Sequence, residues 1–157
     1  MTSTDPPMIA ATLLRCTVGA FMIPHGLQKL GFIGGNRAFE TQAFNTLGLR
    51  PGNVWSAIAG VTQAGLGLLL LIGLFTRPAA ALTAVFMVFA ALVGVRKNGW
   101  YWHNHGMEFA FFWALAAIVV ALLGSGPWAL DHLGAGAHER TNPHELPPRA
   151  PLAGRPG

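Results

Sequence analysis

Charged residues and cysteine are both scarce in this chain. Lys, Arg, Asp and Glu make up 10% of its 157 residues, against about a quarter in soluble domains, which places the chain outside the soluble class. The single cysteine, Cys16, excludes an intramolecular disulfide and a CxxC redox centre, and we expect it to be a small buried residue. The basic residues are scattered and form no cluster, which argues against nucleic acid as a partner.

The start of the chain and its motif content show further absences. The first seven residues contain no Lys or Arg and no small-residue cleavage site, so we expect no cleaved signal peptide. Asp5, followed by two prolines, predicts the start of a helix instead. No HExxH motif or Cys/His set is present, so no metal site is predicted. His103 and His105, together with His25, leave metal or haem ligation open as an alternative.

Long apolar runs are what the sequence has in abundance. Val54–Phe75 holds 22 residues without Asp, Glu, Lys or Arg, and Gln63 is its only strongly polar side chain. At about 1.5 Å per residue, a helix of this length reaches about 33 Å, enough to cross a hydrocarbon core of about 30 Å. Three other segments match it. The sequence therefore predicts an all-α integral membrane four-helix bundle in the lipid bilayer, with spans at Met8–Leu30, Val54–Phe75, Ala79–Val95 and Met107–Leu123.

The predicted membrane domain covers residues 1–133, and the polar tail of residues 134–157 is expected to be disordered. The loop after the first span contains a short amphipathic helix at residues 36–47, which should lie in the headgroup region. Four spans put both termini on one side of the membrane, called side A, and the loops 31–52 and 96–106 on the other, called side B. Side B carries more Lys and Arg, which predicts that it is cytoplasmic.

Two of the predicted spans carry a polar stripe. On the first, the polar and small residues fall within about 120° of one another, a pattern that predicts a face turned toward the protein interior or an aqueous cavity. These residues are Arg15, Gly19, Met22, His25, Gly26 and Lys29. On the second, small or polar residues recur at intervals of three and four, which is typical of close helix packing in lipid. They are Ser56, Gly60, Gln63 and Gly67.

Depth along the spans predicts that His25 and Glu108 approach each other. Each lies about 9–10 Å from the middle of its span toward side B, Lys29 lies nearer the surface, and Gln63 lies near mid-membrane. We expect these four residues to form a polar cavity that opens on side B. The remaining predicted members of this cavity are Trp100, Tyr101, Trp102, His103 and His105.

Each of these residues also has a structural interpretation. Glu108 caps the N–H groups of a helix start, Lys29 extends toward the headgroups, and the aromatic loop belongs to the interfacial belt. The functional interpretation favours a quinone headgroup, whose carbonyls need donors and whose reduction needs protons. In that case His25 and Glu108 handle protons, Lys29 orients an anion and Gln63 donates a hydrogen bond.

Arg15 lies about 6 Å from the middle of the first span toward side A, where an unpaired guanidinium would cost several kcal/mol. We expect a structural role with a partner on side A. Asp131 is the first expectation, and carbonyl groups at a helix C-terminus are the second.

Several motifs together give the chain a family resemblance. They are Arg15 with Gly19, PHGLQKLGF (Pro24–Phe32), Leu47-Gly48, GLGLLLLIGLFTRPAA (Gly65–Ala80), Glu108 and GSGPWALD (Gly124–Asp131). In this order and spacing, they resemble the DoxX family of small four-span bacterial membrane proteins over residues 10–133. Gln63 departs from the family pattern, which often has Glu there, and Ala129 replaces a usual Ser.

The resemblance implies a quinone-linked role in the bacterial inner membrane, because the family is named for a subunit of an archaeal thiosulfate:quinone oxidoreductase. It implies that electrons pass from a small reductant or a partner oxidoreductase to quinone, which is the cofactor. Two alternatives stay open. One is a non-catalytic anchor or assembly subunit for a soluble redox enzyme, and the other is an exporter of a small solute.

Overall fold

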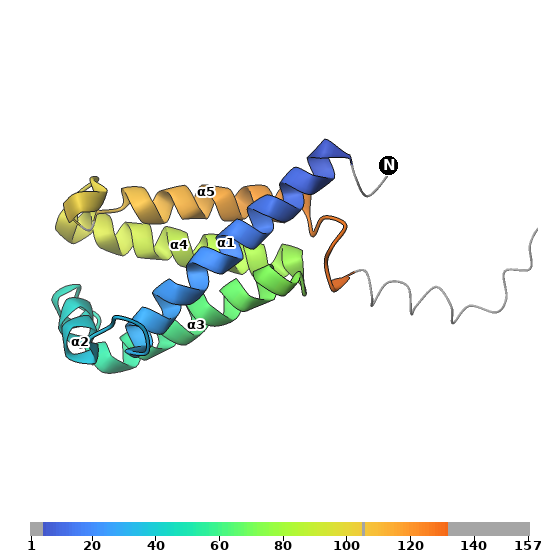
Figure 1. The fold of residues 1–157 in the computed structure, drawn as a ribbon. Coiled ribbons are helices and arrows are strands. Elements are labelled where there is room, and N and C mark those ends of the chain that lie inside the picture. The colour runs from blue at the N-terminus through green and yellow to red at the C-terminus, as the bar shows by residue number, and fades with distance from the viewer. Residues whose placement is uncertain (1–4, 105, 132–157) are drawn as a thin grey trace, which may run out of the picture.

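The computed structural model describes residues 5–104 and 106–131. The predicted tail of residues 134–157 and His105 lie outside these described residues. Within them, every regular element is a helix, which confirms the all-α prediction (Figure 1). The elements are α1 (Pro6–Leu30), α2 (Arg37–Thr46), α3 (Gly52–Ile72), α4 (Thr76–Asn98), the short 3-10 helix η1 (Trp102–Asn104) and α5 (Glu108–Leu123).

Three of these helices are long and apolar enough to cross a bilayer, namely Pro6–Leu30, Gly52–Ile72 and Thr76–Arg96. The helix α5 is equally apolar but has 16 residues, or about 24 Å at 1.5 Å per residue. Large hydrophobic side chains are exposed on all the long helices, as expected where lipid rather than water surrounds the bundle. These features indicate a multi-pass membrane protein in contact with the lipid bilayer.

The long helices form two pairs, α1 with α3 and α4 with α5, and the contacts between the pairs are much fewer. Glycines allow α1 and α3 to approach closely. A Cβ atom on Gly19 would lie 2.7 Å from the carbonyl oxygen of Gly67, and one on Gly60 would lie 2.9 Å from that of Gly26. The predicted small-residue seam of α3 is therefore confirmed as the surface that packs against α1.

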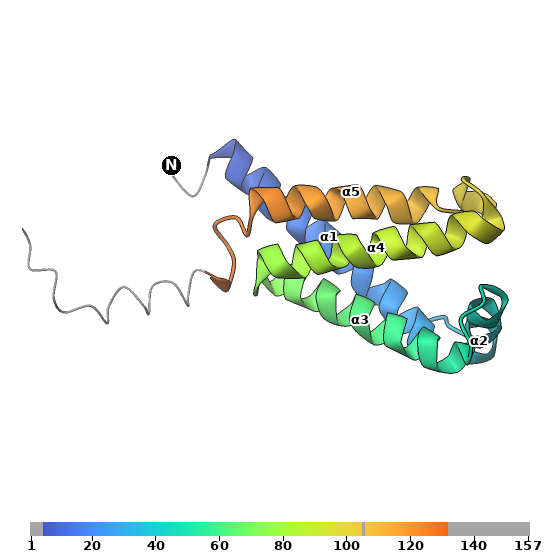
Figure 2. The same ribbon diagram turned by 180° about the vertical axis from the view of Figure 1, so that it is seen from behind.

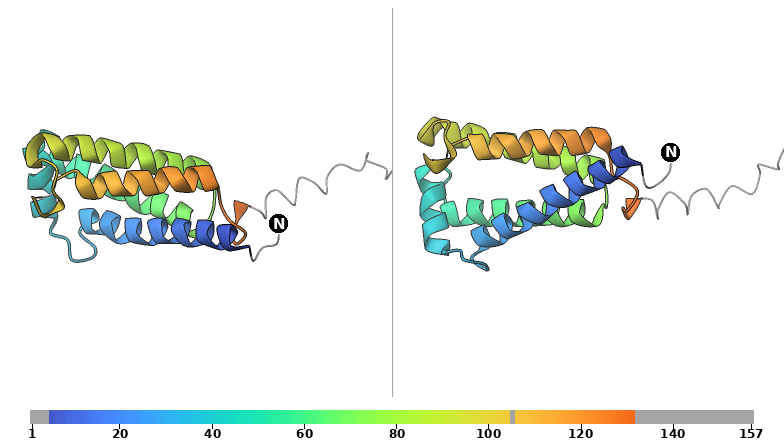
Figure 3. Two further views of the ribbon diagram at one scale, coloured as in Figure 1. Left: turned by 90° about the horizontal axis from the view of Figure 1, so that it is seen from above. Right: turned by 45° about the horizontal axis from the view of Figure 1, so that its top comes forward.

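The chain folds back and forth, so the connections gather at two ends. The start of α1 lies with segment 124–131 at one end, corresponding to side A, and α2 lies with η1 at the other, corresponding to side B (Figures 1 and 2). The two helix pairs diverge toward side B. The short helix α2 runs crosswise over this end (Figure 3).

Local sequence explains most helix boundaries. Asp5 and two prolines precede and open α1, as the sequence predicted. Asn36 caps α2 by accepting from the N–H of Ala38 at 2.9 Å. The predicted start of the third span at Ala79 was wrong, because α4 already begins at Thr76. Proline is tolerated in the first turn of a helix, so Pro78 does not delay its start.

Candidate functional site

Lys29 lies near the side-B end of α1 and directs its ammonium group toward α3. Its Nζ donates to Oε1 of Gln63 at 2.8 Å and to the carbonyl oxygen of His25 at 3.4 Å. The carboxylate of Glu40 on α2 adds an electrostatic attraction. Lys29 is therefore held by side chains and backbone of the bundle itself, rather than extending only toward the headgroups.

Gln63, Lys29 and Ser56 form a polar cluster between α1 and α3. Gln63 lies in the middle of this cluster and is 5% exposed. Its Nε2 donates to the sulfur of Met22 at 3.5 Å, and the hydroxyl of Ser56 donates to the carbonyl oxygen of Lys29 at 3.0 Å. A thioether is a weak acceptor. Among the described residues, Lys29 uses two of its three N–H groups and Gln63 one of its two, so the cluster has donors in excess.

His25 links α1 to the first turn of α5. Its half-buried ring meets the ring of Phe109 edge-on, with a centroid separation of 5.5 Å. Glu108 precedes Phe109, is half-buried, and donates its backbone N–H to the carbonyl oxygen of Trp100 at 3.0 Å. The structure thus places His25 beside the helix turn that carries Glu108. Their proton-handling roles stay predictions.

The aromatic loop lies at the exposed side-B end. Trp100 and Tyr101 are exposed, and the ring of His103 stacks on that of Tyr101 at 5.6 Å. This placement is typical of an interfacial belt. The side chain of Trp102 and all of His105 fall outside the described part, so their predicted roles remain predictions. Within that part, no group of three or more His, Cys, Asp or Glu residues could hold a metal ion.

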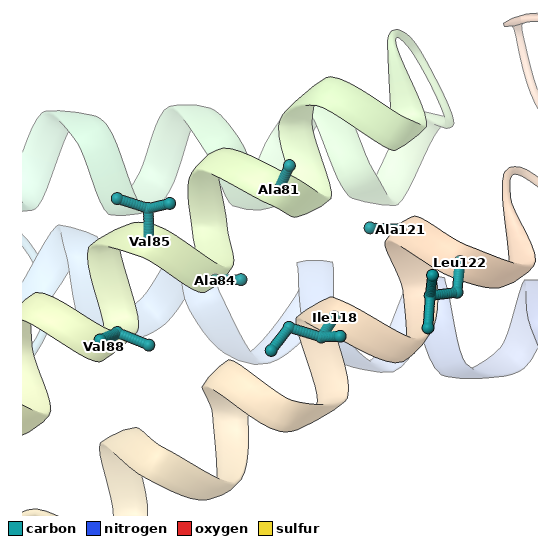
Figure 4. Close-up of a pocket in the computed structure, with 7 residues that line it drawn as sticks. All are labelled: Ala81, Ala84, Val85, Val88, Ile118, Ala121 and Leu122. Carbon is teal, nitrogen blue, oxygen red and sulfur yellow. The ribbon is translucent and has the colours of Figure 1, made fainter.

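Two apolar surface grooves lie elsewhere on the bundle. One, of about 430 Å³, runs between α4 and α5, and Figure 4 shows that only aliphatic side chains line it. The other lies between α1 and α3 and is equally apolar. Neither includes His25, Lys29, Gln63 or Glu108. The two grooves are apolar surfaces that suit acyl chains, and the polar cavity expected on side B stays a prediction.

Arg15 is 1% exposed and is held by four hydrogen bonds to backbone carbonyl groups. It donates to the last turn of α3 and to the segment that follows α5. The acceptors are the carbonyl oxygens of Leu70 at 2.6 Å, Leu71 at 3.0 Å, Ser125 at 2.9 Å and Trp128 at 2.7 Å. Carbonyl groups, the second expectation from the sequence, thus supply the hydrogen bonds of Arg15.

Asp131 caps the start of α4. Its carboxylate accepts from the N–H groups of Phe75 at 2.6 Å and Thr76 at 3.0 Å, at the start of α4. Its own N–H donates to the carbonyl oxygen of Gly73 at 2.9 Å. The first expectation, that Asp131 is the main partner of Arg15, overlooked this cap. Helix N-termini attract carboxylates because their first N–H groups lack acceptors within the helix.

Trp113 on α5 was not among the residues predicted from the sequence. This side chain is 7% exposed, belongs to the hydrophobic core, and contacts the rings of Phe21, Phe109 and Phe112. Its indole N–H finds no hydrogen-bond partner among the residues that the structure describes. One signal was available in the sequence, because tryptophans of membrane helices concentrate at the interfaces and Trp113 lies well inside the apolar run.

Comparison with known proteins places the chain in a family. The sequence profile of the DoxX family matches residues 10–96, which comprise most of α1, all of α2 and α3, and most of α4. An uncharacterised protein of Haemophilus influenzae is 30% identical over 127 residues, which cover 76% of this chain and 86% of that protein. No solved structure matches the chain. The chain therefore belongs to the DoxX family of membrane proteins.

Proposed function

We propose that this protein is a membrane subunit of a quinone-linked oxidoreductase, with the quinone headgroup bound at Lys29 and Gln63. The observation that carries the proposal is the ammonium group of Lys29, which the bundle holds against Gln63 at 2.8 Å. An ionisable side chain inside a membrane bundle is a functional-site hypothesis by default. The cluster has spare donors, and quinone carbonyls accept hydrogen bonds without donating any. The donor set therefore fits the group.

Each residue of the cluster has a defined task in this proposal. When bound, the quinone supplies an acceptor for two electrons and two protons. Lys29 Nζ and Gln63 Nε2 donate hydrogen bonds to it, and the side chains of His25 and Glu108, in their protonated forms, hold the protons to be transferred. The electrons come from a small reductant or a partner oxidoreductase.

The proposed setting is the bacterial inner membrane, with α5 as a fourth span and side B in the cytoplasm. Tilt and local thinning of the bilayer accommodate a short helix at modest cost. Reporter fusions at the N-terminus and after residue 131 test this topology. Both reporters should be active on the same, periplasmic side. Reporters on opposite sides of the membrane would contradict the four-span arrangement.

Direct binding tests the proposed function. The full chain is placed in lipid nanodiscs and titrated with a short-chain ubiquinone by calorimetry. Lys29→Met should weaken binding roughly tenfold or more, because a charged donor is lost. Arg96→Gln is the matched control, since it removes an exposed positive charge from the same end of the bundle. No saturable binding by the wild-type protein, or equal binding by Lys29→Met, would contradict the proposal.

One observation favours a second function, that of an anchor for a soluble redox enzyme. No residue of α2 is buried, and Phe39 is 64% exposed, so among the described residues α2 presents a large apolar side chain at the side-B surface. In this case the partner should remain active at the membrane when His25 and Glu108 are both replaced by Ala. Deletion of residues 36–47 should release it. The opposite pattern supports the quinone site.

A further inference from the structure

Trp113 has an unusual environment for a tryptophan in a membrane bundle. Among the described residues, only two buried side-chain polar atoms lack a hydrogen-bond partner, Nε1 of Trp113 and Oγ1 of Thr76. Thr76 lies at the opposite end of the bundle, at the start of α4, where segment 124–131 packs. Buried indole N–H groups usually find a partner. In a bilayer core no water can replace it, so the unpaired N–H points to an acceptor that the described part of the chain does not supply.

The surroundings of Trp113 suit a flat, apolar ligand. Phe21 on α1 lies 5.5 Å from the indole between ring centroids, and Phe109 on α5 lies 5.9 Å from it. Both phenyl rings are about half exposed on the surface that faces lipid. A ligand that arrives through the hydrocarbon therefore meets these rings before it reaches the indole. Exposed side chains change rotamer rapidly, so the rings can admit it.

A series of ring contacts connects this place to the polar cluster. The ring of Phe109 contacts Trp113 on one side and, at 5.5 Å, His25 on the other. Met22, whose sulfur accepts from Gln63, belongs to the same core cluster as Trp113. Phe109 and Met22 therefore connect Trp113 to the donors around Lys29 and Gln63. A headgroup with acceptors at both ends of a ring matches two separated sets of donors.

We propose that Trp113 is a binding residue for the quinone headgroup, and that its indole N–H donates a hydrogen bond to one of the carbonyl oxygens. This inference rests on the proposed function, because it assigns a further residue to the same ligand. It adds a route of entry from the bilayer past Phe21 and Phe109. Trp113 lies about 7.5 Å along α5 from Glu108, within the apolar part of the helix.

Nuclear magnetic resonance of the indole N–H groups tests the proposal on the wild-type protein. The chain contains five tryptophans and hence five indole signals. On titration with a short-chain ubiquinone, the proton signal of Trp113 should move downfield and saturate, because a new hydrogen bond forms. The signal of Trp55, which lies exposed on α3 and away from the rings around Trp113, should stay in place. Trp113→Phe assigns the signal by its absence, and substitution of the other tryptophans assigns it by elimination if that variant does not fold.

Affinity gives the second measurement. Trp113→Phe keeps an aromatic ring but removes the donor, and should weaken quinone binding roughly three- to tenfold. Trp55→Phe is the matched control and should bind like the wild type. Saturable binding without movement of the Trp113 signal would overturn this inference and leave the proposed function standing. Failure of the wild-type protein to bind quinone at all would overturn both.

Discussion

The ammonium of Lys29 and the amide oxygen of Gln63 lie 2.8 Å apart across the interface between α1 and α3. This hydrogen bond joins two helices that already touch along glycines, so its two ends are held in fixed positions. Lys29 also brings a positive charge into the bundle, and the hydrogen-bond acceptors of its ammonium group are neutral oxygens. Both the stability of the helix pair and the proposed binding of a quinone depend on this hydrogen bond.

Replacement of Gln63 tests the structural part of this relationship. Gln63→Leu removes the acceptor and should lower the free energy of unfolding by roughly 1.5–3 kcal/mol, the range for hydrogen bonds to charged groups. Gln63→Glu retains an acceptor oxygen and should remain within about 1 kcal/mol of the wild type. Loss of helix, followed by circular dichroism in detergent, reports unfolding; the thiol of Cys16 does not serve for this, because it is half-buried rather than buried as expected from the sequence. Equal melting temperatures for Gln63→Leu and the wild type would contradict the assignment.

The glycine seam gives a second prediction. A Cβ atom on Gly19 would lie 2.7 Å from backbone atoms of both Gly67 and Leu71, and backbone cannot move aside cheaply. Gly19→Ala should therefore destabilise the protein by about 1–3 kcal/mol in the same unfolding assay. Gly65 faces open space on α3, so Gly65→Ala should be neutral or slightly stabilising. If the two variants melt together, α1 and α3 do not pack as described.

Arg15 gives a third prediction, because its planar guanidinium reaches carbonyl groups on two separate segments. Lysine keeps the charge but has all its donors on one nitrogen, so it cannot reproduce this geometry. Arg15→Lys should cost at least about 2 kcal/mol of stability. Arg96→Lys, at an exposed position, should change stability by less than about 0.5 kcal/mol. A wild-type melting temperature for Arg15→Lys would show that charge alone is sufficient.

The cap on α4 gives a fourth prediction. Asp131→Ala removes the acceptor for the N–H groups of Phe75 and Thr76, and should cost about 1 kcal/mol. Asp131→Asn keeps one acceptor oxygen and should lose less. Hydrogen exchange at the amide of Thr76 measures the effect locally, and should accelerate in Asp131→Ala. Unchanged exchange would mean that the carboxylate does not protect this helix start in solution.

The helices and their main seam could be predicted from the sequence because both depend on local patterns. The apolar runs fix where α1, α3 and α4 lie, and the spacing of Gly60, Gln63 and Gly67 identifies one face of α3. Depth along each helix also brings His25 close to the start of α5. These inferences need only the rise per residue and the helical period.

Partners that depend on irregular segments could not be predicted. The segment 124–131 turns back so that its carbonyl groups face Arg15 and its carboxylate faces α4, and no periodic pattern describes such a path. Charge complementarity alone favoured Asp131 for Arg15, although a guanidinium is equally well satisfied by carbonyl oxygens. Trp113 was missed for another reason: its burial depends on how the α4–α5 pair meets α1.

A double-mutant cycle on quinone binding tests the central claim most directly. Ubiquinone affinity is measured in nanodiscs for the wild type, Lys29→Met, Gln63→Leu and the double variant. The account holds that Lys29 and Gln63, joined by their hydrogen bond, bind one headgroup together. Each single change should then weaken binding, and the fold-loss of affinity in the double variant should be far smaller than the product of the two single fold-losses. Affinity that is the same in all four proteins, or no saturable binding by the wild type, would contradict the account.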